Sequence, residues 1–178
     1  MTIQENIKIH HVIEKSKVNG PDTRFVIWTQ GCPLNCDGCF NQATHSLDVG
    51  IDIDIKKLAI LINRTKGIRG ITLSGGEPLF QPGAIAKLLQ LIDKKLDVLL
   101  FSGYTLDEIK ADVVKNEVLQ KVDAALLGRY DKNLPHPFYG KKLVLKGDRI
   151  TKEELKPWLK TEIVINDNDV QITGLYKN

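Results

Sequence analysis

The sequence predicts an α/β protein with a mainly parallel sheet, folded as a partial, open β/α barrel. Strand-like apolar runs alternate with helix-like segments along most of the chain, a pattern typical of β–α–β units. The chain has 178 residues, whereas a closed eight-stranded barrel takes about 250. No internal repeat, low-complexity tract or linker divides it. We therefore expect a single domain over residues 1–178.

Three strands and two helices are expected in the first half of the chain. The strands are rich in β-branched and aromatic residues and are expected at residues 7–13, 24–29 and 70–74. A helix is expected over residues 55–64, because Ile55, Leu58 and Ile62 fall on one helical face. Helical spacing of apolar residues predicts a second helix after Pro82.

The second half of the chain continues the alternation and adds a hairpin. Further apolar strands are expected at residues 97–101, 122–127 and 143–145. Two capping boxes, Thr105 with Glu108 and Thr151 with Glu154, predict helix starts. Turn-forming residues between two short β-rich runs predict a terminal hairpin formed by residues 162–165 and 170–173.

Three notable loops follow the carboxyl ends of predicted strands. They are a cysteine-rich loop after residue 29, a Gly-Gly-Glu-Pro run at residues 75–78, and a Ser-Gly-Tyr run at residues 102–104. In parallel α/β sheets, ligands bind beyond the carboxyl ends of the strands. The sequence therefore predicts that these loops converge on one rim as a single active site.

Composition excludes several broad classes. Apolar residues make up 42% and charged residues 26% of the chain, as in a soluble globular protein. The net charge is only +3 without a basic stripe, so we expect no nucleic-acid partner. No apolar run approaches the roughly 18–20 residues that span a bilayer, and no signal-peptide pattern is visible. We expect a cytoplasmic protein without a membrane partner, whose thiols stay reduced and free to bind metal.

The only cysteines are Cys32, Cys36 and Cys39, spaced C-x-x-x-C-x-x-C. An odd number packed so closely does not suit disulfides, which pair residues and usually join distant parts of a chain. It suits a metal centre held by three thiolates. On an iron–sulfur cube, three thiolates leave one iron open to a substrate.

Four interpretations of this loop compete. A ferredoxin-type cluster requires four cysteines, and the chain lacks a fourth. Structural zinc could add His45, although it falls six residues after Cys39, a loose fit to usual spacing. A redox pair of Cys36 and Cys39 leaves Cys32 unexplained. The fourth is a [4Fe–4S] cluster whose open iron binds the amino and carboxylate groups of S-adenosylmethionine (SAM).

The cysteine spacing resembles the signature of radical SAM enzymes. Residues 19–24 and 29–41 are similar to the branch that activates glycyl radical enzymes, and within it to the activating proteins of anaerobic ribonucleoside-triphosphate reductase. The run at residues 74–79 resembles the second motif of that family. Residues 101–105 and 123–130 stand where the family has its third and fourth strand ends. The resemblance covers about residues 19–145.

This resemblance implies a cofactor set, a reaction and partners. Cys32, Cys36 and Cys39 would hold the [4Fe–4S] cluster, and its open iron would hold SAM. Reductive cleavage of SAM would give methionine and a 5′-deoxyadenosyl radical. That radical would take a hydrogen atom from a glycine of a partner glycyl radical enzyme, and the resemblance implies an anaerobic ribonucleotide reductase as that partner. Such an oxidoreductase implies a flavodoxin or ferredoxin as electron donor.

The resemblance also implies which residues contact SAM. Phe40 would pack near the adenine, with ordinary core packing as the alternative. The segment from Ser74 to Gly76 would receive the methionine end, and Glu77 would either add negative charge or brace the loop. Ser102 would hydrogen-bond SAM or serve the helix entry. The full predicted set is Phe40, Asn41, Ser74, Gly75, Gly76, Glu77, Pro78, Ser102 and Gly103.

Two positions depart from the family pattern. Asp22 stands where the family often has glycine, and residues 140–144 replace a Gly-Ser-x-Asn-Gln stretch. The second departure affects the region expected to touch a macromolecular substrate. It keeps open a small radical SAM enzyme acting on a peptide or small molecule, and, from another class, a zinc-stabilised binding module.

Overall fold

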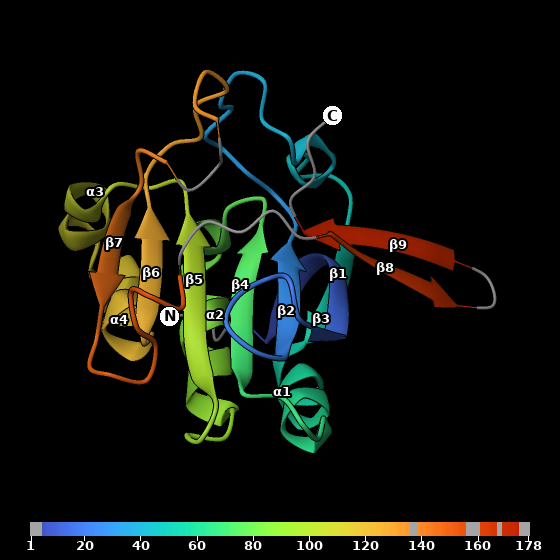
Figure 1. The fold of residues 1–178 in the computed structure, drawn as a ribbon. Coiled ribbons are helices and arrows are strands. Elements are labelled where there is room, and N and C mark those ends of the chain that lie inside the picture. Colours follow the sequence, from blue (N-terminus) through green and yellow to red (C-terminus); the bar gives the residue numbers. More distant parts are fainter. Residues whose placement is uncertain (1–4, 136–138, 156–160, 167–168, 175–178) are drawn as a thin grey trace.

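A seven-stranded sheet forms the centre of the computed structural model, which describes residues 5–135, 139–155, 161–166 and 169–174 (Figure 1). The strand order is β3-β1-β2-β4-β5-β6-β7. The strands are β1 (Asn6–Ser16), β2 (Arg24–Thr29), β3 (Ile51–Asp54), β4 (Gly70–Gly75), β5 (Asp97–Ser102), β6 (Ala124–Leu127) and β7 (Lys142–Leu145). Strands β2, β4, β5 and β6 run parallel, and β1, β3 and β7 extend the sheet antiparallel. Since β3 and β7 stay unpaired with each other at the described edges, the predicted open α/β fold is confirmed.

Helices cover one face of this sheet. Figure 1 shows α1 (Ile55–Arg64), α2 (Pro82–Leu91) and α4 (Val113–Lys121) behind the strands, with the short α3 (Leu106–Ala111) at one side. Buried residues such as Phe25, Leu73 and Leu88 fill the layer between sheet and helices. The predicted helices over residues 55–64 and after Pro82 are confirmed. None of the described helices is both long and apolar enough to span a bilayer.

A buried ion pair ties the amino ends of the parallel strands together. The Arg24 guanidinium, fully buried at the start of β2, lies 2.6 Å from the Asp97 carboxylate at the start of β5. That contact lacks hydrogen-bond alignment at Asp97 Oδ1, so it is chiefly a charge contact. Arg24 Nε also donates to Thr72 Oγ1 in β4 over 2.8 Å. With three strands fixed at this end, their carboxyl ends lie side by side at the other.

Several local predictions need correction. The strand expected from residue 122 begins at Ala124, and β3 was not predicted although its Ile-Asp-Ile-Asp sequence alternates. The Thr105 capping box forms as predicted, but a second helix begins at Val113, capped by Asp112. At the other box, Glu154 N donates to Thr151 Oγ1, and residues 152–155 form turns; residues 156–160 lie outside the described part.

The predicted terminal hairpin is confirmed. It consists of β8 (Thr161–Asn166) and β9 (Asp169–Gly174), which form a separate two-stranded sheet. In Figure 1 the hairpin projects from the side of the molecule where β1 and β2 lie.

Candidate active site

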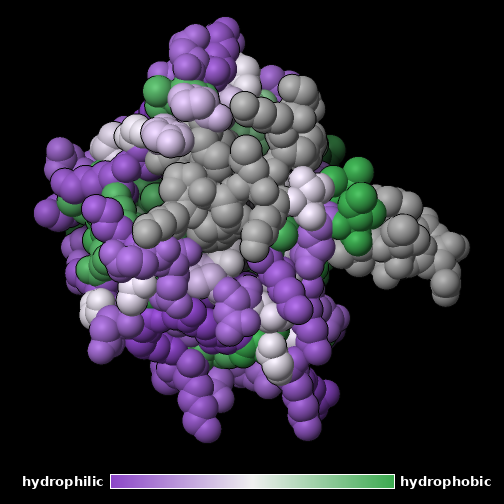
Figure 2. Space-filling model, viewed as in Figure 1, coloured by the Kyte–Doolittle hydropathy of each residue, from purple (hydrophilic) through white to green (hydrophobic). Residues whose placement is uncertain are grey.

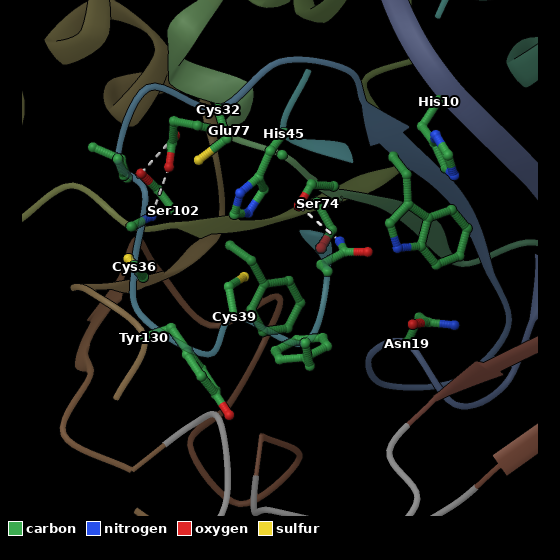
Figure 3. A pocket seen from close by; sticks show the side chains of 18 of the residues that line it. His10, Asn19, Cys32, Cys36, Cys39, His45, Ser74, Glu77, Ser102 and Tyr130 are labelled. Carbon is green, nitrogen blue, oxygen red and sulfur yellow. Dashed lines mark hydrogen bonds between the residues drawn. The ribbon is translucent and has the colours of Figure 1, made fainter. Parts of the chain in front are cut away.

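A pocket of about 350 Å³ lies at the carboxyl ends of β2, β4 and β5 (Figure 3). All three cysteines line it, together with every predicted SAM-contacting residue except Pro78. Pro78 is buried at the first position of the 3₁₀ helix η2 (Pro78–Phe80). The structure therefore brings the three predicted loops together, because parallel neighbours end at the same edge of a sheet.

The cysteine loop, residues 31–41, is anchored at its start by backbone hydrogen bonds. Gly31 N donates to Thr44 O over 2.8 Å, and Cys32 N donates to His45 O over 3.1 Å. The three thiols are free and partly buried. Burial raises the pKa of the Cys32 and Cys39 thiols above the ordinary value. Thiolates at these positions therefore need a bound metal or a nearby cation to stabilise them.

No three His, Cys, Asp or Glu side chains in the described part of the chain are arranged to hold a metal ion. The thiols line the pocket wall, and His45 lies on the same wall. The metal centre is therefore identified by its three thiol donors and by the chain's relatives, and not by a preformed coordination geometry.

Glu77 braces the ends of β4 and β5. Its buried carboxylate accepts hydrogen bonds from Ser102 Oγ at 2.8 Å, Gly103 N at 2.7 Å and Leu79 N at 2.9 Å. Burial raises the pKa of this carboxyl, and the three donors oppose that rise. Of the two roles expected for Glu77, the geometry supports the loop brace. The Ser102 hydroxyl gives its proton to Glu77 and accepts from Tyr104 N, so it is already engaged.

The Gly75-Gly76 step is required by close packing between strands. A Cβ at Gly75 would lie 2.3 Å from Thr29 N, and one at Gly76 would lie 2.4 Å from Gly31 O. Gly75 also has a φ of +112°, which favours glycine. Asn41 Nδ2 donates to Gly75 O over 2.8 Å, so the cysteine loop is fastened directly to this step.

Phe40 is 65% exposed at the pocket, which excludes the alternative of ordinary core packing. Its ring meets Tyr130 edge to face, with centroids 5.4 Å apart. Phe40 therefore presents an aromatic surface to the pocket. Its neighbour Tyr130 also lines the pocket but was not predicted as a site residue.

The wall opposite the cysteines was missed from the sequence. Figure 3 shows His10 and Asn19 on this side, away from Cys36 and Cys39. His11 stacks on Trp28 with ring centroids 4.6 Å apart. These residues come from β1, the end of β2 and the turn between the two strands. The strand over residues 7–13 was predicted, but the antiparallel pairing of β1 with β2 that brings these residues to the pocket was not.

Lys141 was also missed as a site residue. It lies in the departing segment 140–144 and is the single Lys or Arg among the described residues that line the pocket. Its ammonium donates to Gly128 O and forms no ion pair within the described residues. Burial lowers the pKa of Lys141, while Cys36, Glu77 and Cys39 oppose that shift. The pocket thus holds one formal cation beside the thiols.

The other departure from the family pattern, Asp22 in place of glycine, is explained by its backbone conformation. Asp22 adopts a φ of 60°, in the left-handed region that favours glycine. Its Oδ1 accepts a hydrogen bond from Thr23 N over 2.7 Å. Aspartate tolerates this conformation through such local hydrogen bonds, so the turn keeps its shape without glycine.

Comparison with known proteins identifies the chain's relatives. Residues 18–148 match the model of the 4Fe-4S single cluster domain. The anaerobic ribonucleoside-triphosphate reductase-activating protein of Pasteurella multocida is 32% identical over 130 residues, which cover 67% of this chain and 82% of the relative. The protein of the same name from Enterobacteria phage T4 is 34% identical over 126 residues, covering 66% and 78%. QueE from Escherichia coli resembles the fold only distantly, with a TM-score of 0.45, 15% identity, and coverage of 56% of this chain and 54% of that one.

The chain therefore belongs to the 4Fe-4S single cluster family and, within it, to the anaerobic ribonucleoside-triphosphate reductase-activating proteins. This membership confirms the family expected from the sequence and, with it, an enzyme whose cofactors are a [4Fe–4S] cluster and SAM. It also decides among the interpretations of the cysteine loop in favour of iron and sulfur over zinc.

Proposed function

We propose that this protein is a radical SAM activase that generates a glycyl radical on a partner enzyme, an anaerobic ribonucleotide reductase. The carrying observation is that the three cysteines, the residues from Gly75 to Glu77 and the cation Lys141 line one pocket at the parallel strand ends. The named relatives supply the class of partner.

The residues present fit the cofactors. Three free thiols on one pocket wall provide the soft sulfur ligands that iron–sulfur clusters use. Cys32, Cys36 and Cys39 would hold the cluster, leaving one iron without a protein ligand. When bound and reduced, the cluster supplies the electron that cleaves SAM and so starts hydrogen abstraction from a glycine Cα.

The chain's own residues would then bind and orient SAM. Lys141, as the single described pocket cation, is placed to pair with the SAM carboxylate. Carbonyls of the step from Ser74 to Gly76 would accept from its ammonium, and the exposed ring of Phe40 would face the adenine. Glu77 would hold these loops in register without touching SAM, because its carboxylate is occupied by three donors.

The electron donor we propose is a flavodoxin or ferredoxin, acting with this protein in the cytoplasm. Both are small redox proteins able to deliver single electrons to a buried cluster. The proposal for the donor follows from the one-electron requirement of the reaction.

Anaerobic reconstitution with iron and sulfide tests the proposal. The reconstituted protein should bind iron and sulfide, cleave SAM to 5′-deoxyadenosine when reduced, and give a glycyl radical signal by electron paramagnetic resonance once the reductase is added. SAM cleavage without any glycyl radical would favour a small radical SAM enzyme with another substrate. One zinc and no iron or sulfide per chain would end the enzyme interpretation.

A further inference from the structure

The hairpin β8–β9 lies outside the residues that the family model matches. The match covers residues 18–148, and the hairpin begins at Thr161. Hydrogen bonds nevertheless attach it to the chain near the start of the matched residues. Asn19 Nδ2 donates to Thr173 Oγ1 over 2.9 Å, and Lys17 N donates to Glu162 Oε1 over 3.4 Å. The hairpin is thus held against the turn that leads into β2.

This hairpin forms part of the pocket. Ile172, Thr173 and Gly174 of β9 line it together with Asn19 and His11. The cysteines line the opposite side, so the pocket has a cysteine end and a hairpin end (Figure 3). A cofactor held at the cysteine end leaves the hairpin end for the molecule that gives up its hydrogen atom.

An apolar pair stands on the outward face of the hairpin. Ile163 and Ile172 are directly opposite each other in the strand register, with exposed fractions of 60% and 59%. Their neighbours in register, Glu162 and Thr173, point to the other face, where they bond Lys17 and Asn19. Figure 2 shows hydrophobic surface where the hairpin leaves the body of the molecule, on a surface that is otherwise largely hydrophilic.

The hairpin also offers strand edges. Among the described strands, β8 pairs with β9 alone, so each has one edge without a strand partner. Unpaired edges accept an extended peptide through main-chain hydrogen bonds, and side chains beside the edge supply selectivity. The edge of β9 that pairs with no other described strand, Ile172 and the pocket-lining residues Thr173 and Gly174 are contiguous along β9.

We infer that the hairpin β8–β9 is the docking element for the glycine-bearing segment of the partner, which binds in extended form beside Ile172 and enters the pocket at its hairpin end. This inference rests on the proposed function, since it takes the hydrogen donor to be a peptide. An extended segment around a glycine fits the site because its backbone can pair with a strand edge and its glycine has no side chain to obstruct entry into the pocket.

The variant Ile163→Ser tests the inference in the reconstituted full chain, because Ile163 stands opposite Ile172 on the hairpin and does not line the pocket. Ile51→Ser is the matched control, because Ile51 is 58% exposed in the edge strand β3 and does not line the pocket. Two reactions are measured: 5′-deoxyadenosine formation with a chemical reductant and no partner, and glycyl radical formation on the purified reductase at increasing reductase concentration.

Ile163→Ser should cleave SAM without partner at the wild-type rate, while the reductase concentration giving half-maximal glycyl radical rises about tenfold, the effect of losing one buried interface side chain. The control should match wild type in both reactions. An unchanged half-maximal concentration in Ile163→Ser would overturn the inference, as would an equal loss of SAM cleavage. If the wild type cleaves SAM but forms no glycyl radical, the proposed function itself fails.

Discussion

The carboxylate of Glu77, just beyond β4, accepts a hydrogen bond from the hydroxyl of Ser102, at the end of β5, over 2.8 Å. The same carboxylate accepts from Gly103 N at 2.7 Å. One buried side chain thereby fixes the relative positions of two loops that were predicted to receive SAM. On our proposal, Glu77 would therefore influence SAM binding by holding the two loops in place, without contacting SAM itself.

Glu77→Gln should weaken both folding and SAM binding. An amide keeps one acceptor oxygen and adds two N–H donors, which would face donors already pointing at this site. We expect the free energy of unfolding to fall by about 1–3 kcal/mol, the cost of an unsatisfied buried polar group. Chemical denaturation and equilibrium dialysis of SAM would measure the two effects. The exposed Asp107→Asn is the control, and a Glu77→Gln protein equal to it in both assays would contradict the brace.

Cys36→Ala should remove the cluster and leave the sheet folded. Its thiol is partly exposed in a loop at the sheet edge, so little packing is lost. Iron content and 5′-deoxyadenosine formation should collapse while the far-ultraviolet circular dichroism spectrum stays unchanged. Asp37→Asn, next to it in the same loop, should keep its iron. Wild-type SAM cleavage by Cys36→Ala would refute the assignment of this ligand.

Lys141→Met should reduce affinity for SAM through the lost pairing with the carboxylate. Wild-type protein should bind decarboxylated SAM at least about tenfold more weakly than SAM, consistent with a charge-assisted contact of about 1.5–3 kcal/mol. The variant should bind both ligands equally weakly, and the reconstituted iron content should be unchanged. Lys142→Met, at the neighbouring exposed position, is the control. If the variant still distinguishes the two ligands as wild type does, Lys141 does not hold the carboxylate.

Stability should depend on pH through Glu154. Its hydrogen bond with Arg69 lowers the pKa of Glu154 from 4.5 to about 2. A carboxyl with a lowered folded-state pKa stabilises the fold above its unfolded pKa, and that contribution disappears as pH falls toward 2. Glu154→Gln should therefore cost about 0.5 kcal/mol at pH 7, as expected for a partly exposed pair, and progressively less below pH 4.5. Thermal unfolding across this range, with Glu153→Gln as the control, would check it; a difference independent of pH would contradict it.

Several helices and strands could be predicted from local sequence patterns, because an apolar repeat or a helix cap depends only on residues close together in the chain. The helix over residues 55–64 followed from apolar spacing, and the Thr105 cap from a hydroxyl and a carboxylate three residues apart. The strand β3 was missed despite its alternation, because four residues give too short a pattern to stand out. The helix break at Asp112 was missed, although the Asp112 side chain caps α4 locally by accepting hydrogen bonds from Val114 N and Lys115 N.

The sequence by itself determined the chemistry of this protein: three cysteines at fixed spacing, a glycine-rich strand end and the family to which they belong. Those features are formed by residues close together in the chain, so they can be recognised without knowing how the chain packs. Only the tertiary structure decided that Glu77 bonds Ser102, that Lys141 is the cation of the pocket, and that β9 forms its far wall. Each of these joins residues far apart in the chain, where strand register and side-chain packing, rather than neighbouring sequence, determine which groups meet.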